Sequence, residues 1–212
     1  MDNPSFFQLP SNIERTLQTT NSNRVINQLK VLNVHLTEGS RFNREKWSSE
    51  LSPLIGVWNK IMSNHQSILE YKLKGNNVDA APLDAFVLME CEKAHNLVKY
   101  VNSEILSLTK VINGSVLLSP KISALGNSLL RSQVPDRWSD QWEGPEDPYN
   151  WLSGLVSRAV ALEKWAERVD QGTLLTNPVD LGELIRPETF LNALRQQTAR
   201  LAKCPVDALK CQ

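Results

Sequence analysis

Residues 82–112 read PLDAFVLMECEKAHNLVKYVNSEILSLTKVI, the longest stretch of the chain in which apolar residues return every three or four positions. Because an α-helix turns once in 3.6 residues, this spacing places the apolar side chains on one face for about eight turns. Pro82 suits the first helical position, where a missing N–H costs nothing, and Gly114 suits the residue after the end. The stretch predicts one long helix with a buried face.

Two further helices are expected before residue 82. Ser22 or Asn23 can cap the first of them, which Gly39 ends. The second begins near Asn43, and Pro53 should kink it or split it in two, because proline removes a backbone hydrogen bond. Residues 75–81 then form a loop of Gly, Asn and Asp.

Three helices are expected after residue 114. Ser119 caps one that runs to residue 134, and Asp147 caps another that continues through Trp165. Residues 132–147 and 172–185 are irregular. Because no alternation of apolar and polar residues outlasts four positions, the fold class is expected to be all-α, an irregular multi-helix bundle.

The last helix follows from residues 185–201, IRPETFLNALRQQTARL. Pro187 stands at its start, and three- and four-residue steps predict a single buried stripe. The residues of that stripe are Phe190, Leu191, Leu194, Thr198 and Leu201. Arg195 and Arg200 cannot share the stripe fully, so we expect them to point toward solvent or toward another module.

The composition argues against several classes of protein. The chain has 212 residues and 23 residues of each charge sign, which gives no global electrostatic case for nucleic acid or an anionic membrane. No apolar run approaches the ~18–20 residues that cross a bilayer, and the start does not resemble a signal peptide. Cys91, Cys204 and Cys211 are expected to be reduced thiols. A soluble, intracellular protein is expected.

The motifs of common catalytic and cofactor sites are absent from the sequence. There is no phosphate loop and no dinucleotide fingerprint, so ATP binding is not expected. His35, His65 and His95 stand far apart, and we expect surface or helix-flank positions for them rather than a metal site. The acidic residues Glu143, Glu146 and Asp147 are interpreted as a solvated loop in which Asp147 caps a helix. No catalytic, cofactor or metal residue is predicted.

The six Trp residues fall into two groups. Trp47, Trp58, Trp151 and Trp165 lie on apolar stripes of expected helices and are predicted to be core residues. Trp138 and Trp142 lie in the irregular segment, next to Arg137 in the first case. Large aromatic residues beside arginine are typical of interface hot spots, so these two are candidates for an inter-domain contact.

Four segments, in order along the chain, resemble the end of dynein heavy chains. They are LPSNIE at residues 9–14, VPDRW at residues 134–138, the series Trp151, Leu152, Arg158 and Trp165, and PETFLNALRQQTAR at residues 187–200. Residues 142–148, WEGPEDP, and residues 180–187, DLGELIRP, differ from most dyneins. Both are similar to the cytoplasmic dynein 2 subfamily, the retrograde motors of intraflagellar transport.

This resemblance implies a domain organisation and a role. Residues 1–20 would be the exit from the sixth AAA+ module, its lid, and residues 21–212 the helical portion of the C-terminal domain. Family members continue into β-strands that form a small barrel, which is not expected in this sequence. The implied role is structural and non-catalytic, the support and coupling of the AAA+ ring in a microtubule minus-end-directed motor.

The implied partners are the AAA+ ring modules of the same heavy chain and other dynein subunits, in the cytoplasm, cytoskeleton and cilium. Trp138, Trp142, Arg195 and Arg200 are the candidate contact residues. The alternative is a free-standing helical adaptor that binds a partner through its Trp-bearing faces. An enzyme ranks third, because convergent titratable groups are not evident in the sequence.

Overall fold

The computed structural model describes residues 15–16, 18–26, 42–71, 81–176 and 178–209. The chain divides into two compact units, Met1–Asn43 and Arg44–Gln212. In the first unit, residues 18–26 are already helical, so the predicted helix start at Ser22 or Asn23 is wrong. The end predicted at Gly39 lies outside the described residues, as does the predicted loop up to residue 80.

The described part of the second unit is built from helices. The order is α2 (Arg44–Asn64), α3 (Ser67–Glu70), α4 (Pro82–Ile112), α5 (Pro120–Leu130), α6 (Asp136–Ser139), α7 (Pro148–Asp170), the 3₁₀ turn η2 (Leu181–Glu183), α8 (Pro187–Ala202) and the 3₁₀ turn η3 (Val206–Ala208). No strand occurs among the described residues, and the predicted all-α fold is confirmed.

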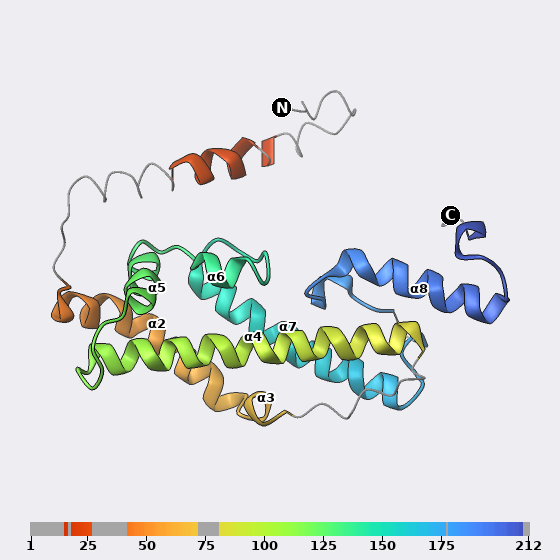
Figure 1. Cartoon of the computed structure of the whole chain (residues 1–212), viewed down its shortest axis with the longest axis horizontal. Coiled ribbons are helices and arrows are strands. Elements are labelled where there is room, and N and C mark those ends of the chain that lie inside the picture. The colour runs from red at the N-terminus through yellow and green to blue at the C-terminus, as the bar shows by residue number, and fades with distance from the viewer. Residues whose placement is uncertain (1–14, 17, 27–41, 72–80, 177, 210–212) are drawn as a thin grey trace. The chain divides into compact units, whose positions relative to one another are not determined.

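Helix α4 is the centre of this unit. Its 31 residues extend for about 46 Å at 1.5 Å per residue, and Figure 1 shows it across the middle of the unit with α7 and α8 along it. Helices α2, α3, α5, α7 and α8 all contact it. Only a narrow ridge faces outward, with Met89 63% and Leu106 48% exposed. The long helix predicted from residues 82–112 is confirmed.

The helix starts follow the local sequence. The Ser119 hydroxyl accepts a hydrogen bond from the Ile122 N–H at 3.3 Å, and the Asp147 carboxylate accepts one from the Asn150 N–H at 2.9 Å. A proline stands in the first turn of α4, α5, α7 and α8. These side chains satisfy or replace the N–H groups that a helix start leaves unpaired, and the predicted starts of α4, α5, α7 and α8 are confirmed.

The end of α4 also follows the prediction. Gly114 adopts a φ of +74°, the left-handed conformation that lets a helix terminate. The Arg44 guanidinium donates a hydrogen bond to the Ile112 carbonyl and lies over Gly114, so a Cβ at that position would collide with it. One glycine therefore both ends α4 and makes room for the contact with α2.

Pro53 does not split α2, which continues from Arg44 to Asn64. Proline cannot donate to the Ser49 carbonyl, but Ser49 and Pro53 both lie on the exposed side of the helix. Water can hydrogen-bond to that carbonyl, so the missing bond does not have to break the helix. The predicted split is wrong for this reason.

The buried face of α8 differs from the predicted stripe. Phe190 and Ala193 are buried, whereas Leu191 is 49% and Leu201 78% exposed, and Thr198 is exposed as well. Consecutive residues of a helix point about 100° apart, so Phe190 and Leu191 cannot both face α4. The contact with α4 selects the Phe190 face, and the prediction of burial for Leu191, Thr198 and Leu201 is wrong.

Candidate functional site

Trp138 and Trp142, predicted as inter-domain contacts, lie in the core of their own domain. Trp138 is 0% exposed, and its ring stacks on that of Trp151 with centroids 5.5 Å apart. Trp142 is 5% exposed and lies 5.2 Å from the same Trp151 ring. In this structure Trp138 therefore presents no surface to a partner, and Trp142 presents very little.

The Trp138 indole is fixed by a buried carboxylate on α4. Its Nε1–H donates to Glu104 Oε2 at 2.8 Å, while the Tyr100 hydroxyl and the Lys121 ammonium donate to Glu104 Oε1 at 2.8 Å and 2.9 Å. Burial by itself raises the pKa of Glu104, but the hydrogen bonds from Lys121, Trp138 and Tyr100 outweigh burial and leave the pKa lowered. Glu104 thus joins α4, α5 and α6 through one side chain.

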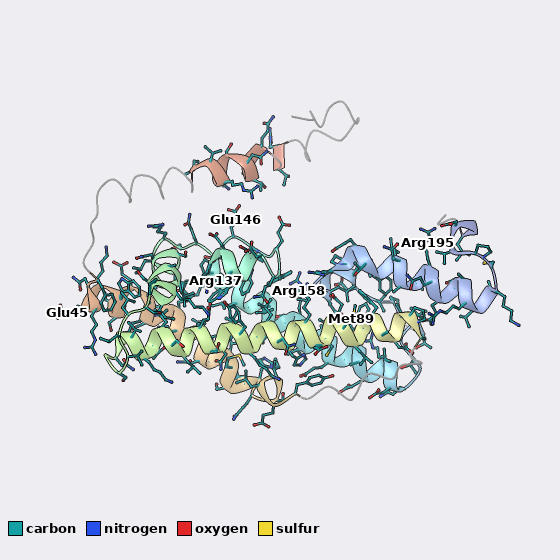
Figure 2. The ribbon with its side chains drawn as sticks, in the orientation of Figure 1. Glu45, Met89, Arg137, Glu146, Arg158 and Arg195 are labelled. Carbon is teal, nitrogen blue, oxygen red and sulfur yellow. The ribbon has the colours of Figure 1, made fainter. Side chains whose placement is uncertain are left out.

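Trp142 lines a groove between the α6–α7 segment and the start of α8. The groove has a volume of about 470 Å³, and its lining includes Ser139, Asp140, Gln141, Trp142, Glu143, Arg158, Arg186 and Glu188. The Arg158 guanidinium lies over the Trp142 ring at 4.5 Å from the centroid, a cation–π contact. Figure 2 shows Arg158 beside the point where α8 begins.

Arg195 and Arg200 lie elsewhere on α8. Arg195 Nη2 donates to the carbonyls of Val206 and Leu209 at 3.2 Å and 3.5 Å, so it ties α8 to η3, and the predicted orientation toward solvent or another module is wrong. Arg200 is exposed and lines a shallow hollow at the end of α8, together with Cys204. The four predicted contact residues are not brought together, and an inter-domain role for them stays a prediction.

A second buried carboxylate on α4 holds the segment that leads into α8. Glu90 is 4% exposed, and its Oε2 accepts hydrogen bonds from the backbone N–H groups of Ile185 at 2.7 Å and Arg186 at 2.9 Å. These partners are 95 and 96 positions away in the sequence. Glu90 therefore fixes where α8 begins relative to α4.

A family model for the C-terminal domain of the dynein heavy chain matches residues 19–212 of this protein. The chain belongs to this family. It is 44% identical over 209 residues to cytoplasmic dynein 2 heavy chain 1 of Rattus norvegicus and of Homo sapiens, and 35% identical over 223 residues to that of Chlamydomonas reinhardtii. Each match covers 99% of this chain and 5% of the relative, so the chain spans about one twentieth of those proteins.

Sequence reasoning missed a buried histidine in this dynein C-terminal domain. His95 is 1% exposed, not on the surface as predicted, and its ring stacks on Tyr71 at 4.0 Å. Its Nδ1 lies 2.6 Å from the Cys91 carbonyl oxygen, and its Nε2 lies 2.9 Å from Glu163 Oε1 on α7. The available signal was its place between Ala94 and Leu97, inside the densest apolar part of residues 82–112.

Cys91, His95 and Glu163 are in contact in the same order as the nucleophile, base and acid of a cysteine hydrolase. Their surroundings, however, do not suit that chemistry. The Cys91 sulfur lies 3.6 Å from His95 Nδ1, and Cys91 is 0% exposed. Burial raises the pKa of Cys91 to about 11, so at neutral pH it is a thiol. The nucleophile in cysteine chemistry is the thiolate, and it has to be reached by substrate. The geometry supports packing between α4 and α7.

The described residues contain no metal-binding cluster and no membrane-spanning helix. Within them, no three His, Cys, Asp or Glu side chains come close enough together to hold a metal ion. No helix in the same ranges is both long and apolar enough to span a bilayer. Cys91 and Cys204 are free, and Cys211 lies outside the described residues.

Proposed function

We propose that this chain is the helical part of the C-terminal domain of a cytoplasmic dynein 2-type heavy chain. In that motor it would support the AAA+ ring and couple its modules mechanically, with no nucleotide chemistry of its own. The observation that carries the proposal is the 44% identity to cytoplasmic dynein 2 heavy chain 1 over 209 residues, together with the match to the family model.

The motor that contains this chain would have a defined cellular location and defined partners. The motor would move toward microtubule minus ends in retrograde intraflagellar transport, within the cytoplasm, cytoskeleton and cilium. Its C-terminal domain would contact the AAA+ ring modules of the same heavy chain and other dynein subunits, with no nucleic acid or membrane partner. Residues 1–20 would be the exit from the sixth AAA+ module, and residues 21–212 the helical portion of the C-terminal domain.

The packing around α4 suits a mechanical role. A helix of 31 residues is contacted by five others, and two buried carboxylates tie it to distant segments. Glu90 holds Ile185 and Arg186, and Glu104 holds Trp138. Hydrogen bonds to a charged acceptor are about twice as strong as neutral ones, so both ties resist relative motion of the helices. A unit built this way can transmit force between the surfaces it contacts.

The mechanical role is tested in a whole heavy chain that carries this segment, by the change Glu90→Gln. A neutral amide oxygen accepts the Ile185 and Arg186 N–H groups more weakly, which loosens the start of α8. We expect microtubule gliding to slow several-fold while ATP turnover stays within about twofold of the parent. The chain alone should not turn over ATP. Gliding velocity and ATPase rate are measured on the same preparation.

The matched control is Glu146→Gln, which removes the charge of an exposed carboxylate that lies in the loop before α7 and does not line the groove. It should leave both gliding and ATP turnover near the parent values. An equal loss of gliding and ATP turnover for Glu90→Gln would argue against a coupling role. Unchanged gliding in a variant whose α8 is demonstrably loosened would argue against it as well.

A further inference from the structure

Two arginines in the groove beside Trp142 have unused hydrogen-bond donors. Arg158 makes one long hydrogen bond, from Nη1 to the Gly154 carbonyl at 3.4 Å, and its buried Nε has no acceptor among the described residues. Neither Arg158 nor Arg186 forms a salt bridge with a described carboxylate. A buried N–H donor without an acceptor is unfavourable, so the Nε of Arg158 favours a ligand that brings an acceptor to this part of the groove.

The Arg158 guanidinium is held in place before any ligand arrives. It lies 4.5 Å above the Trp142 ring, and Gly154 leaves the room for both, since a Cβ there would lie 3.2 Å from Trp142 and 3.5 Å from Arg158. Burial lowers the pKa of Arg158 and the charge of Asp180 acts in the opposite direction, so the guanidinium is a partly desolvated cation with one carboxylate nearby. A fixed, partly desolvated fork of N–H donors is suited to bidentate recognition of a planar anion.

A third cation nearby is also without an acceptor. The Lys93 ammonium is buried and unpaired among the described residues. Burial and the charge of Arg186 lower its pKa, whereas Glu90 and Glu188 act in the opposite direction. The Glu90 carboxylate is occupied by the Ile185 and Arg186 N–H groups. Near the start of α8, the Nζ of Lys93 and the Nε of Arg158 are therefore both buried without an acceptor among the described residues.

The rim of the groove decides between kinds of anion. Three carboxylates line it, those of Asp140, Glu143 and Glu188, and all three residues are exposed. These carboxylates repel a phosphate dianion more strongly than a carboxylate, because a carboxylate carries only one negative charge. We therefore expect a carboxylate rather than a phosphate between Arg158 and Arg186. A volume of about 470 Å³ is within the range that holds a side chain with its backbone.

We propose that this groove binds a Glu or Asp side chain from a protein partner, in a segment where Lys or Arg flanks the acidic residue. The carboxylate would bind Arg158 and Arg186, and the basic neighbour would pair with the rim carboxylates. Arginines inside the groove and carboxylates on its rim match a protein segment that carries charges of both signs. The inference does not depend on the mechanical role proposed above.

The test is a titration of the chain, followed by NMR of the Arg158 Nε–H resonance. The probes are the peptide acetyl-Lys-Gly-Glu-Gly-Lys-amide, its twin with Gln in place of Glu, and inorganic phosphate. We expect a saturable shift with the Glu peptide and about tenfold weaker binding of the Gln twin, since charge-assisted hydrogen bonds are lost. Arg158→Gln should reduce binding similarly, while the control Arg137→Gln, on exposed Arg137 of α6, should not.

Three results would overturn the proposal. They are equal affinity for the Glu peptide and its Gln twin, unchanged affinity in Arg158→Gln, and tighter binding of phosphate than of the Glu peptide. If Arg158→Gln does not fold, exposed Arg186 provides the second variant, and unchanged affinity in Arg186→Gln would contradict the proposal too. The gliding assay with Glu90→Gln and this peptide titration test different claims, so failure of one does not decide the other.

Discussion

Replacement of Glu104 by alanine is expected to lower the free energy of unfolding by about 3–5 kcal/mol, because it removes a buried carboxylate that accepts three hydrogen bonds. The Trp138 indole N–H is then left buried without an acceptor, and the Tyr100 hydroxyl and the Lys121 ammonium lose theirs. Urea unfolding of the parent and the variant measures the difference. The control is Glu146→Ala, at an exposed loop position, which should change stability by less than about 0.5 kcal/mol.

The contribution of Glu104 should also depend on pH. Its folded-state pKa is lowered, so its contribution is fully present above the unfolded-state pKa of about 4.3 and is lost as pH falls through the folded-state value. The stability difference between the parent and Glu104→Gln should therefore be constant near neutral pH and shrink below about pH 4. A difference that stays constant, or grows, on acidification would contradict the ionised, hydrogen-bonded carboxylate.

Replacement of Phe190 by alanine should cost about 3–5 kcal/mol, the range for a buried aromatic side chain. Phe190 is 4% exposed and makes edge-to-face contacts with Phe86 on α4 and Trp165 on α7, both with ring centroids 6.0 Å apart. Its loss leaves a cavity where three helices meet. Thermal and urea unfolding of the variant give the cost.

The neighbouring residue provides the matched control. Leu191 is 49% exposed, so Leu191→Ala should cost less than about 1 kcal/mol. The two substitutions lie one position apart on the same helix and both introduce alanine. Differences in helix propensity between the two variants are therefore small, and burial accounts for most of the difference in stability. Similar losses in both variants would mean that α8 packs through the stripe predicted from sequence rather than through the face that contacts α4.

Local signals in the sequence located several helix ends but not the buried faces of the helices. The start of α4 at Pro82, its end before Gly114 and the caps Ser119 and Asp147 depend on nearby residues, and these predictions were confirmed. The face of α8 depends on what lies opposite it. Phe190 and Leu191 fit a 3/4 pattern equally well, and only the position of α4 decides which of them is buried.

The buried polar residues could not be predicted for a similar reason. Glu90 and Glu104 both lie on the apolar face of α4. The partner Ile185 of Glu90 is 95 positions away, and the partner Trp138 of Glu104 is 34 positions away. Sequence spacing gives no sign of such pairs. The irregular segment and the adjacent Arg137 predict an inter-domain contact for Trp138, whereas its contacts with Glu104 and Trp151 place it in the core.

The central structural claim is that the unit is organised around α4, and amide hydrogen exchange tests it most directly. Residues 98–105 should exchange only through global unfolding, because helices cover α4 on most sides. Their rates should be at least about a hundredfold below those of η3, or ~2.8 kcal/mol in opening free energy. Exchange in residues 98–105 as fast as in η3 would contradict the account, because α4 would then open without the rest of the fold.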